Sequence, residues 1–419
     1  MRHLMLIVLV FTTAAQAATA AEDAKVKVDA KPYVEVTGVL GMDSSLVELK
    51  DGSLLTNGGA GSVDGGKTWS EPRSFGEGVA GNSIMRLNSG SLALTSGQYQ
   101  TGKMWVSRDE GLTWEPRGVV KTPEPKGGLV ADFYDPVIQL KSGRLLYPWD
   151  MDVISGNLVG MTYAGMTARG EWKGKTYDIE GHNHIPEFYT GGVSYSDDEG
   201  KTWTYDTTYG CPNTMMGWFD FKGEVNGMAG CTPFGEGTMA ECKDGRIIWI
   251  GRSTVGRILY TYSGDQGRTW DPLRPSELAS SGSPPRLRRI PKTGDLMCVW
   301  NQVSRDETSR GYRRGRLSAA ISTDCGATWS HFKAIELSDG LKDVARIPPQ
   351  FPIKMSRAKQ WCGKLADGYM YFHYANICFA GDRVYIMYSR GGPRLGIAEQ
   401  MLEKQDQVLR IYSLDWFYK

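Results

Sequence analysis

One eight-residue pattern, Ser-x-Asp-x-Gly-x-Thr-Trp, recurs five times along the 419-residue chain without an exception. The copies are SVDGGKTW (62–69), SRDEGLTW (107–114), SDDEGKTW (196–203), SGDQGRTW (263–270) and STDCGATW (322–329). The Asp can accept backbone N–H groups across a tight turn, and the Gly can adopt the positive φ that closes it. Thr and Trp then favour a returning strand. Each copy therefore predicts the turn of a β-hairpin.

A second repeated hairpin precedes each of these turns and occurs once more near the C-terminus. It consists of apolar residues, a short turn that contains Gly, and a second apolar strand. The six copies are LVELKDGSLL (46–55), IMRLNSGSLAL (84–94), VIQLKSGRLLYPW (137–149), MAECKDGRIIWIGR (239–252), LRRIPKTGDLMCVW (287–300) and ICFAGDRVYIMYSR (377–390). Two hairpins per unit give four antiparallel strands. Six such units predict an all-β fold, a six-bladed β-propeller of four-stranded antiparallel blades.

The organisation of the chain departs from this repeat in two places. The sixth unit lacks the Ser-x-Asp turn, so we expect residues 408–418 to form its outer strand and residues 34–40 to help close the ring. The third unit carries an insertion around residues 150–190 without clear periodicity, and a loop of this length is usually functional or disordered. We expect a single propeller domain over residues 21–419, with an ordered lid in blade 3.

Residues 1–20 have the pattern of a cleavable signal peptide. A short basic region at Arg2 and His3 precedes an apolar stretch over residues 4–11, and the small-residue tripeptides AQA and ATA follow. The apolar stretch is shorter than the ~20 residues that a membrane span needs. The sequence therefore predicts a secreted or periplasmic protein without a membrane span.

Net charge and cysteine spacing argue against a nucleic-acid partner and against a bound metal. The formal net charge is +1, so the basic footprint of a nucleic-acid-binding protein is absent. The seven cysteines show no CxxC and no zinc-ligand spacing, and we expect neither a metal nor a cofactor. An odd count leaves at least one cysteine unpaired in a monomer. Cys211 and Cys231 bound a Gly-rich stretch and could form a disulfide.

Five Ser-x-Asp turns on a six-unit propeller resemble the sialidase (neuraminidase) superfamily, in which such turns are called Asp-boxes. The resemblance covers nearly the whole mature chain, and it is more specific for the fold than for the activity. It implies that the Asp-boxes lie on the rim, away from the substrate. It also implies chemistry on the inner strands at the channel mouth. There a Tyr activated by a Glu attacks the sugar, an Asp acts as general acid and base, and three arginines bind a substrate carboxylate.

Three residues match the family pattern in the fourth and fifth units. The stretch EGTMAECKDGRIIWIGR resembles the family segment that begins with the assisting Glu and ends in a carboxylate-binding Arg. This implies that Glu236 assists the nucleophile and that Arg252 binds the substrate. The stretch RRGRLSAAISTDCGATW resembles the run from a second such arginine into an Asp-box, which implies the same role for Arg314.

The family's nucleophile has a candidate counterpart in this sequence, whereas the family's first arginine has none. HYANICFAGDRVYIMY resembles the family segment that carries the nucleophile, which implies Tyr374, with Tyr369 and Tyr371 as rivals in the same aromatic-rich run. The first arginine of the family has no counterpart, because Met42 lies near its place. Arg390 ends the sixth hairpin as Arg252 ends the fourth, so Arg390 could substitute for the missing arginine.

The general acid is also missing from its usual loop, since only TNGGAG precedes the first Asp-box. Asp135 enters the third inner hairpin as Glu236 enters the fourth, and it is our candidate for a displaced general acid. His182 and His184 lie on the insertion and could contact substrate or exchange protons near neutral pH.

These features predict an exported, sialidase-like glycoside hydrolase that acts on a terminal acidic sugar, such as sialic acid, of a glycan or polysaccharide. One alternative is a polysaccharide lyase or another uronate-directed enzyme on the same propeller, in which His182 or His184 and a Tyr abstract a proton. The other alternative is a non-catalytic glycan-binding propeller.

Overall fold

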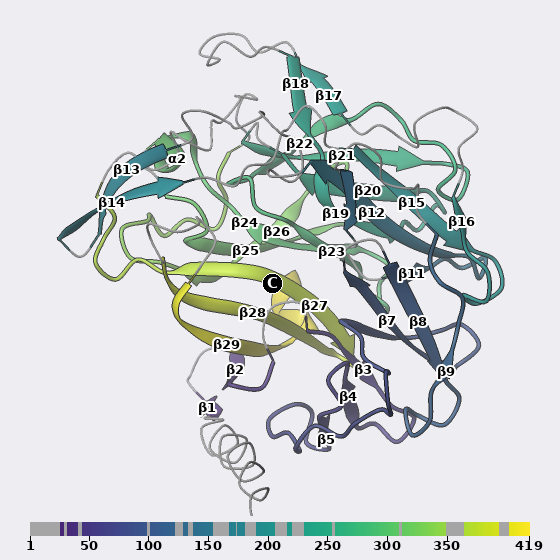
Figure 1. Cartoon of the computed structure of the whole chain (residues 1–419). Coiled ribbons are helices and arrows are strands. Elements are labelled where there is room, and N and C mark those ends of the chain that lie inside the picture. The colour runs from purple at the N-terminus through teal and green to yellow at the C-terminus, as the bar shows by residue number, and fades with distance from the viewer. Residues whose placement is uncertain are drawn as a thin grey trace, which may run out of the picture.

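The computed structural model describes most of the chain. The described residues are 26–28, 32–40, 44–98, 101–121, 129–132, 137–153, 167–172, 174–180, 190–205, 216–219, 230–253, 256–309, 312–348, 364–393 and 402–419. Antiparallel sheets succeed one another around a common centre as six blades (Figure 1). The all-β, six-bladed propeller that the repeats predict is therefore confirmed. The predicted signal peptide, residues 1–20, lies outside the described residues.

The first three blades follow the chain in order, each from its inner to its outer strand. Blade 1 consists of β3 (Leu46–Glu48), β4 (Leu54–Thr56) and β5 (Gly61–Ser62). Blade 2 consists of β6 (Ser83–Arg86), β7 (Leu92–Gln98), β8 (Thr101–Ser107) and β9 (Glu115–Pro116). Blade 3 consists of β11 (Ile138–Gln139), β12 (Leu145–Val153), β15 (Thr190–Ser196) and β16 (Thr204–Tyr205), with β10 (Leu129–Asp132) paired to the far end of β12.

The last three blades carry the residues that matter for the site. Blade 4 consists of β19 (Gly235–Glu241), β20 (Ile247–Arg252), β21 (Arg257–Ser263) and β22 (Arg274–Ala279). Blade 5 consists of β23 (Arg286–Arg289), β24 (Leu296–Asn301), β25 (Arg316–Ser322) and β26 (Ser330–Leu337), and the short helix α2 (Arg305–Ser309) lies between β24 and β25. Blade 6 consists of β27 (Tyr371–Ala380), β28 (Arg383–Pro393), β29 (Leu402–Ser413), β2 (Tyr33–Thr37) and β1 (Val26–Val28).

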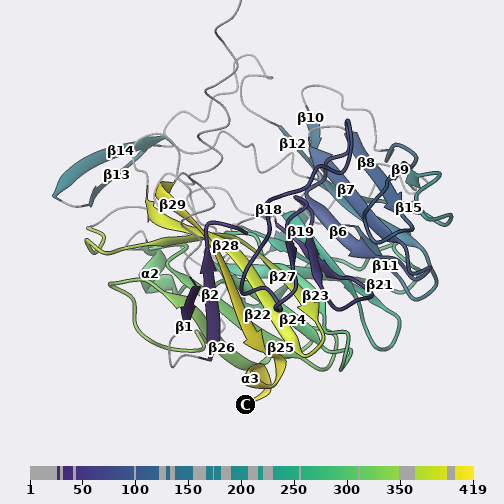
Figure 2. The ribbon, with the colours of Figure 1, turned by 90° about the horizontal axis from the view of Figure 1, so that it is seen from below.

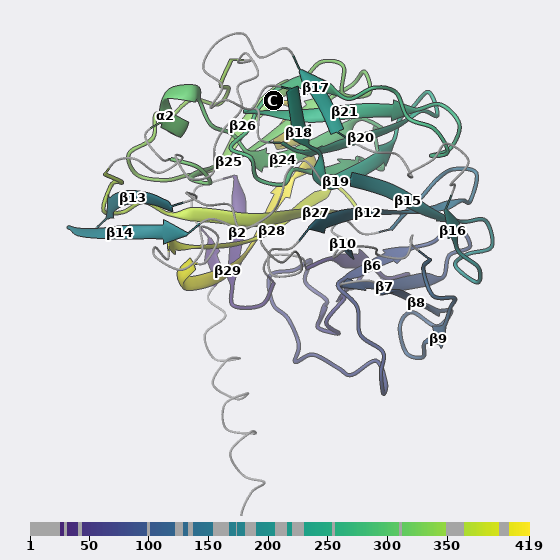
Figure 3. The same cartoon turned by 45° about the horizontal axis from the view of Figure 1, so that its top comes forward.

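Two further hairpins interrupt the repeat. The hairpin β13 (Thr167–Trp172) and β14 (Lys175–Glu180) belongs to the insertion in blade 3 and projects from the edge of the ring (Figure 3). The hairpin β17 (Met216–Phe219) and β18 (Gly230–Pro233) precedes blade 4. The insertion therefore contains regular structure, which its sequence did not predict, and its role as a lid stays a prediction.

The hydrophobic core is divided among the blade interfaces. Among the described residues, six apolar clusters each join two neighbouring blades. The cluster between blades 3 and 4, for example, places Leu146 and Val193 against Met239 and Trp249. Burial between successive sheets of this kind holds the inner strands around the centre. No helix in the described part of the chain is long and apolar enough to cross a membrane.

The Asp-box turns have the hydrogen bonds that the repeat predicts. In blade 2, Asp109 Oδ1 accepts the backbone N–H of Thr113 at 2.9 Å, and Asp109 Oδ2 accepts the Thr113 hydroxyl at 2.6 Å. Gly111 has φ of +83° and donates its N–H to the Ser107 hydroxyl at 2.7 Å. The Thr113 hydroxyl and its backbone N–H lower the pKa of Asp109 to about 2. Equivalent bonds occur in the other four copies, so each conserved position of the repeat has a structural purpose.

The N-terminal strand closes the ring. Strand β2 pairs antiparallel with β29, which confirms that residues 34–40 help to complete blade 6 (Figure 2). Buried Glu35 on β2 forms ion pairs with Arg410 Nε at 2.9 Å and with Arg390 Nη2 at 3.0 Å. Glu336 on β26 pairs with Arg410 Nη2 at 2.7 Å and with Arg390 Nη1 at 3.2 Å. We call these four residues the closing cluster.

The prediction for residues 408–418 is partly wrong. Strand β29 ends at Ser413, and residues Leu414–Tyr418 form the helix α3. Leu414 and Phe417 are buried in the cluster between blades 5 and 6, so one turn of helix buries residues that a continued strand would place on opposite faces.

A disulfide connects blades 4 and 5. Cys242 follows β19, and Cys325 occupies the variable fourth position of the blade 5 Asp-box, with Cα atoms 5.4 Å apart. Cys298 and Cys378 are free thiols. The pairing of Cys211 with Cys231 stays a prediction, because Cys211 lies outside the described residues.

Candidate active site

The structure brings Tyr374 and Glu236 together, although 138 positions separate them in the sequence. Tyr374 lies on β27 of blade 6, Glu236 lies on β19 of blade 4, and the Tyr374 hydroxyl donates to Glu236 Oε1 at 3.2 Å. A phenol that donates to a carboxylate can lose its proton to that carboxylate as it attacks an electrophile.

The backbone at both residues is unusual in the same way. Glu236 has φ of +45° and Tyr374 has φ of +49°, in a region that bulky residues rarely adopt. Each residue lies in a β-bulge. The register between β19 and β20 shifts between Gly235 and Thr238, and the register between β27 and β28 shifts between His373 and Asn376. Bulges of this kind redirect a side chain out of the regular alternation of a strand.

The bulge in blade 4 depends on a glycine. A Cβ on Gly237 would lie 2.1 Å from Nε1 of the buried Trp249, so the indole occupies the space that any other side chain needs. The bulge therefore packs tightly against the core of its own blade, and the surrounding structure fixes the strained conformation of Glu236.

Arg252 forms an ion pair with Glu236. It is the last residue of β20 and lies opposite Gly235 in the register, and its Nη1 donates to Glu236 Oε2. The two oxygens of the Glu236 carboxylate thus accept hydrogen bonds from different partners, a guanidinium and a phenol. The guanidinium favours the ionised carboxylate.

Arg314 lies above the Tyr374 ring. It lies two residues before the start of β25, it is only 5% exposed, and its guanidinium carbon is 5.1 Å from the ring centre. Its Nη1 is 3.3 Å from Nδ1 of His373. In the described part of the chain no carboxylate pairs with Arg314. A buried positive charge without a negative partner is costly, so this arginine is well suited to bind an anionic group.

The rival tyrosines lie elsewhere. Tyr369 is fully buried, and its hydroxyl accepts the backbone N–H of Arg313 at 2.9 Å. Tyr371 packs against the rings of Tyr369 and His373. The hydrogen bond to Glu236 distinguishes Tyr374 from both.

Arg390 belongs to the closing cluster. Three carboxylates, those of Glu35, Glu336 and Asp406, lie within 3.5 Å of its guanidinium nitrogens. Its predicted role in substrate binding is therefore the least supported of the three arginines. Asp135, His182, His184 and Met42 lie outside the described residues, and the roles of the first three stay predictions.

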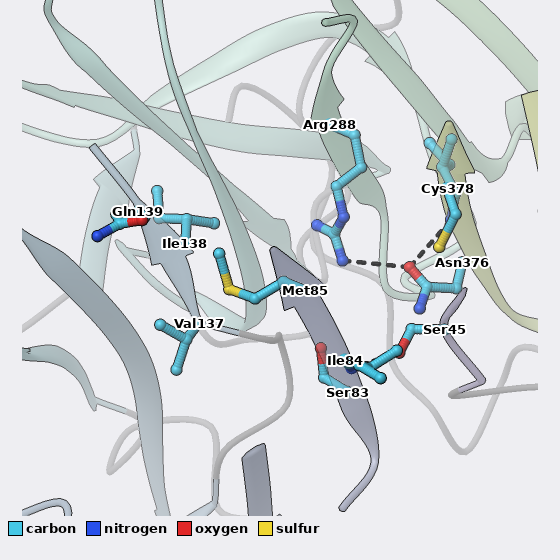
Figure 4. A pocket seen from close by; sticks show the side chains of 11 residues that line it. Ser45, Ser83, Ile84, Met85, Val137, Ile138, Gln139, Arg288, Asn376 and Cys378 are labelled. Atoms are coloured by element: carbon cyan, nitrogen blue, oxygen red, sulfur yellow. Dashed lines mark hydrogen bonds between the residues drawn. The ribbon is translucent and has the colours of Figure 1, made fainter. Parts of the chain in front are cut away.

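A cavity of about 200 Å³ lies among the inner strands beside this site (Figure 4). Blades 2 and 3 line it with four apolar residues and with Ser83 and Gln139, and the lining from blades 5 and 6 includes Arg288, Asn376 and Cys378. Arg288 donates to Asn376 Oδ1 at 3.1 Å and to Thr238 Oγ1 at 3.2 Å. Asn376 and Thr238 each follow the candidate site residue of their strand by two positions, so this network braces both bulged strands.

The sequence did not single out His373, Arg288 or Asn376. Alternation along β23 places Arg286 and Arg288 on one face, and this signal could have indicated an arginine at the centre of the ring. For His373 no sequence signal existed, because its partner Arg314 lies on a different blade, 59 positions away in the sequence.

The chain is similar to several solved structures. A GH93 α-L-arabinofuranosidase of Fusarium graminearum in complex with arabinobiose is 14% identical, with 90% of this chain and 94% of that chain covered and a TM-score of 0.47. A Hadza microbial sialidase is 15% identical, with 90% and 66% covered and a TM-score of 0.47. A Dyadobacter fermentans protein of unknown function is 15% identical, with 92% and 93% covered and a TM-score of 0.46.

No curated protein matches the chain significantly in sequence. A family model does match, that of the BNR repeat-like domain, over residues 97–386. This range covers more than half of the chain and includes four of the five Asp-boxes. The Asp-box propeller that the sequence resembles is confirmed, and the chain belongs to the BNR repeat-like family.

Proposed function

We propose that this protein is an exported glycoside hydrolase of the sialidase type, which removes a terminal acidic sugar from glycans. The observation that carries the proposal is the Tyr374–Glu236 hydrogen bond beneath a buried arginine that has no carboxylate partner among the described residues. Export is inferred from the signal-peptide pattern of residues 1–20.

The pairing of a Tyr with a Glu suits an acidic sugar whose reacting carbon bears a carboxylate. An anionic nucleophile would be repelled by that carboxylate, whereas a phenol approaches as a neutral group. The Tyr374 oxygen forms a bond to the anomeric carbon as its proton passes to Glu236. The bond to the leaving oxygen breaks, and a general acid protonates that oxygen. We assign this acid to Asp135.

The second half of the reaction restores the enzyme. A water molecule attacks the anomeric carbon, the bond to Tyr374 breaks, and Glu236 returns the proton to the phenolate oxygen. Asp135 accepts a proton from the attacking water. Arg314 binds the substrate carboxylate through the N–H groups that His373 does not use, and Arg252 contributes while it holds Glu236. His182 and His184 are candidate contacts to the rest of the glycan.

The proposal is tested by Tyr374→Phe. We expect wild-type protein to release nitrophenol from the 4-nitrophenyl α-glycoside of N-acetylneuraminic acid, and the variant to lose ~10³-fold or more in kcat. Tyr371→Phe is the matched control, since it removes a hydroxyl from the same strand and should retain activity. Absence of turnover by wild-type protein, or equal losses in the two variants, would contradict the proposal.

Two other substrates separate the alternatives. An unsaturated, ultraviolet-absorbing product from a uronate polysaccharide, lost in His182→Ala or His184→Ala, would indicate a lyase. Binding of acidic glycans without any product would indicate a non-catalytic propeller. A neutral aryl α-L-arabinofuranoside serves as the uncharged comparison, and we expect it to react much more slowly than the acidic glycoside.

A further inference from the structure

We propose that His373 is a positioning residue: its neutral imidazole accepts a hydrogen bond from Arg314 and holds that guanidinium over Tyr374 without cancelling its charge. The assignment deepens the proposed function and rests on it, because it gives Arg314 the task of binding the substrate carboxylate. His373 itself touches no reacting atom in this scheme.

The geometry fixes the imidazole in place. His373 is the last residue of β27 in regular register before the bulge, where it pairs with Ser389 of β28. It is 2% exposed, and its ring lies 5.5 Å from the Tyr371 ring and 6.1 Å from the Tyr374 ring. From this regular position the ring reaches Arg314, at 3.3 Å from Nδ1 to Nη1.

The direction of this hydrogen bond follows from the chemistry of the two groups. A guanidinium has only donors, so Nδ1 must be the unprotonated acceptor and Nε2 must carry the proton. Burial holds the pKa of His373 well below its usual value, and the charge of Arg314 lowers it further, so the ring is neutral at physiological pH. Nε2 has no hydrogen-bond partner in the described part of the chain, and the Arg314 contact is the polar interaction of this ring.

A neutral acceptor has a different consequence from a carboxylate. Two residues further along, Arg316 is bound by both oxygens of Glu307, at 3.0 and 2.9 Å, and that pair leaves no net charge for a ligand. His373 occupies one N–H group of Arg314 and leaves its positive charge uncompensated. A carboxylate at position 373 would instead compete with the carboxylate of the substrate.

Three substitutions at His373 test the proposal by steady-state kinetics on the acidic aryl glycoside. His373→Leu removes the acceptor at similar volume, and we expect KM to rise ~10-fold with kcat within ~3-fold, because ground-state binding of the carboxylate is lost. His373→Asn keeps an acceptor oxygen and should restore KM to within ~3-fold of wild type. An unchanged KM in His373→Leu, or no rescue by Asn, would overturn the proposal.

His373→Asp tests the effect of a negative charge beside Arg314. It should raise KM for the acidic glycoside at least as far as His373→Leu does, and it should leave KM for the carboxyl methyl ester of the same glycoside close to that of wild type. Equal effects on acid and ester would mean that the substitution acts through folding and not through Arg314, which contradicts the proposal.

A second readout does not require turnover. Phenylglyoxal labelling of the folded protein, mapped by peptide mass spectrometry, should modify Arg314 faster in His373→Leu than in wild type and at the wild-type rate in His373→Asn. Arg316 is the internal control and should stay protected throughout. If wild type hydrolyses no acidic glycoside but Arg314 labels as expected, the proposed function fails and the positioning stands. If the labelling of Arg314 does not respond, the positioning fails whatever the activity.

Discussion

Buried arginines at the closing cluster and at the channel mouth differ in what balances their charge. At the closing cluster, Arg410 and Arg390 lie between Glu35 and Glu336, which approach from strands on either side. At the mouth, Arg314 is as buried as Arg410 but lies against a neutral imidazole and an aromatic face. The first arrangement is neutralised within the protein. In the second, no carboxylate in the described part of the chain neutralises Arg314, and a ligand can supply the negative charge.

An arginine close to Arg314 in the sequence does have a carboxylate partner. Arg316 follows two residues later and is paired by Glu307, which α2 brings to it. The difference between the two arginines is therefore not a matter of burial or of a scarcity of acids nearby. We infer that Arg316 and the two arginines of the closing cluster serve the fold and that Arg314 serves the substrate.

The largest effect on stability is expected from Glu35→Gln. Removing this charge leaves Arg410 and Arg390 short of a buried partner, which costs about 3–5 kcal/mol in systems of this kind. Chemical denaturation should show the loss, while the folded variant keeps its kcat. Glu77→Gln is the control, since Glu77 is exposed and the change should cost less than ~0.5 kcal/mol. A loss as small as that of the control would mean that the cluster does not hold the ring closed.

Arg314→Gln should reduce activity and leave stability nearly unchanged, the opposite of Glu35→Gln. We expect kcat/KM for the acidic glycoside to fall ~100-fold, about 2.7 kcal/mol of transition-state binding, with little change in the free energy of unfolding. Arg316→Gln is the matched control in the same segment and should destabilise the protein, because it strands the buried Glu307 carboxylate. Similar destabilisation by both variants would remove the distinction between the two arginines.

The sequence predicted the propeller because every fixed position of the Asp-box has a local task. Ser, Asp, Gly, Thr and Trp each make or permit a bond within eight residues, as at 107–114, so the pattern cannot vary without loss. The candidate pair Tyr374 and Glu236 could be named from family pattern, and the structure places them in hydrogen-bond contact. The two bulges that carry them could not be predicted, because each depends on register and on φ at single residues.

Long-range partners account for what the sequence did not reveal. Arg390 occupies a position like that of Arg252, yet a carboxylate 355 residues away holds it in the closing cluster. The disulfide partner of Cys242 occupies the variable position of an Asp-box, where the pattern contains no information. The role of His373 depends on Arg314, which approaches from the neighbouring blade. The first contact depends on the N-terminal strand that completes blade 6, and the other two depend on packing between blades. Sequence periodicity records neither.

Acid should weaken the closing cluster. Burial alone would raise the pKa of Glu35, but the hydrogen bond from Arg390 and the charge of Arg410 lower it below its ordinary value of 4.5. A lowered pKa in the folded state contributes stability that is fully present above about pH 4.5 and is lost as the pH falls through the folded value. Thermal unfolding of wild type should therefore become easier across that range, and Glu35→Gln should show a shallower dependence. A parallel pH dependence in both proteins would contradict this prediction.

The Asp-box carboxylates differ from both groups of charges above, because hydrogen bonds and not ion pairs balance them. Substituting them should have the smallest effect on stability and activity. Asp109 is balanced by hydrogen bonds from Thr113 and not by a cation, and its pKa of about 2 means that its contribution is lost only as the pH falls from 3.8 toward 2. Asp109→Asn keeps one acceptor oxygen, so we expect a loss of about 1 kcal/mol in denaturation and no change in kcat/KM. Asp198→Asn should match it, because the same bonds recur in blade 3. A loss of activity in either variant comparable to that of Arg314→Gln would place these turns in the chemistry of the mouth and would remove the separation between rim and site.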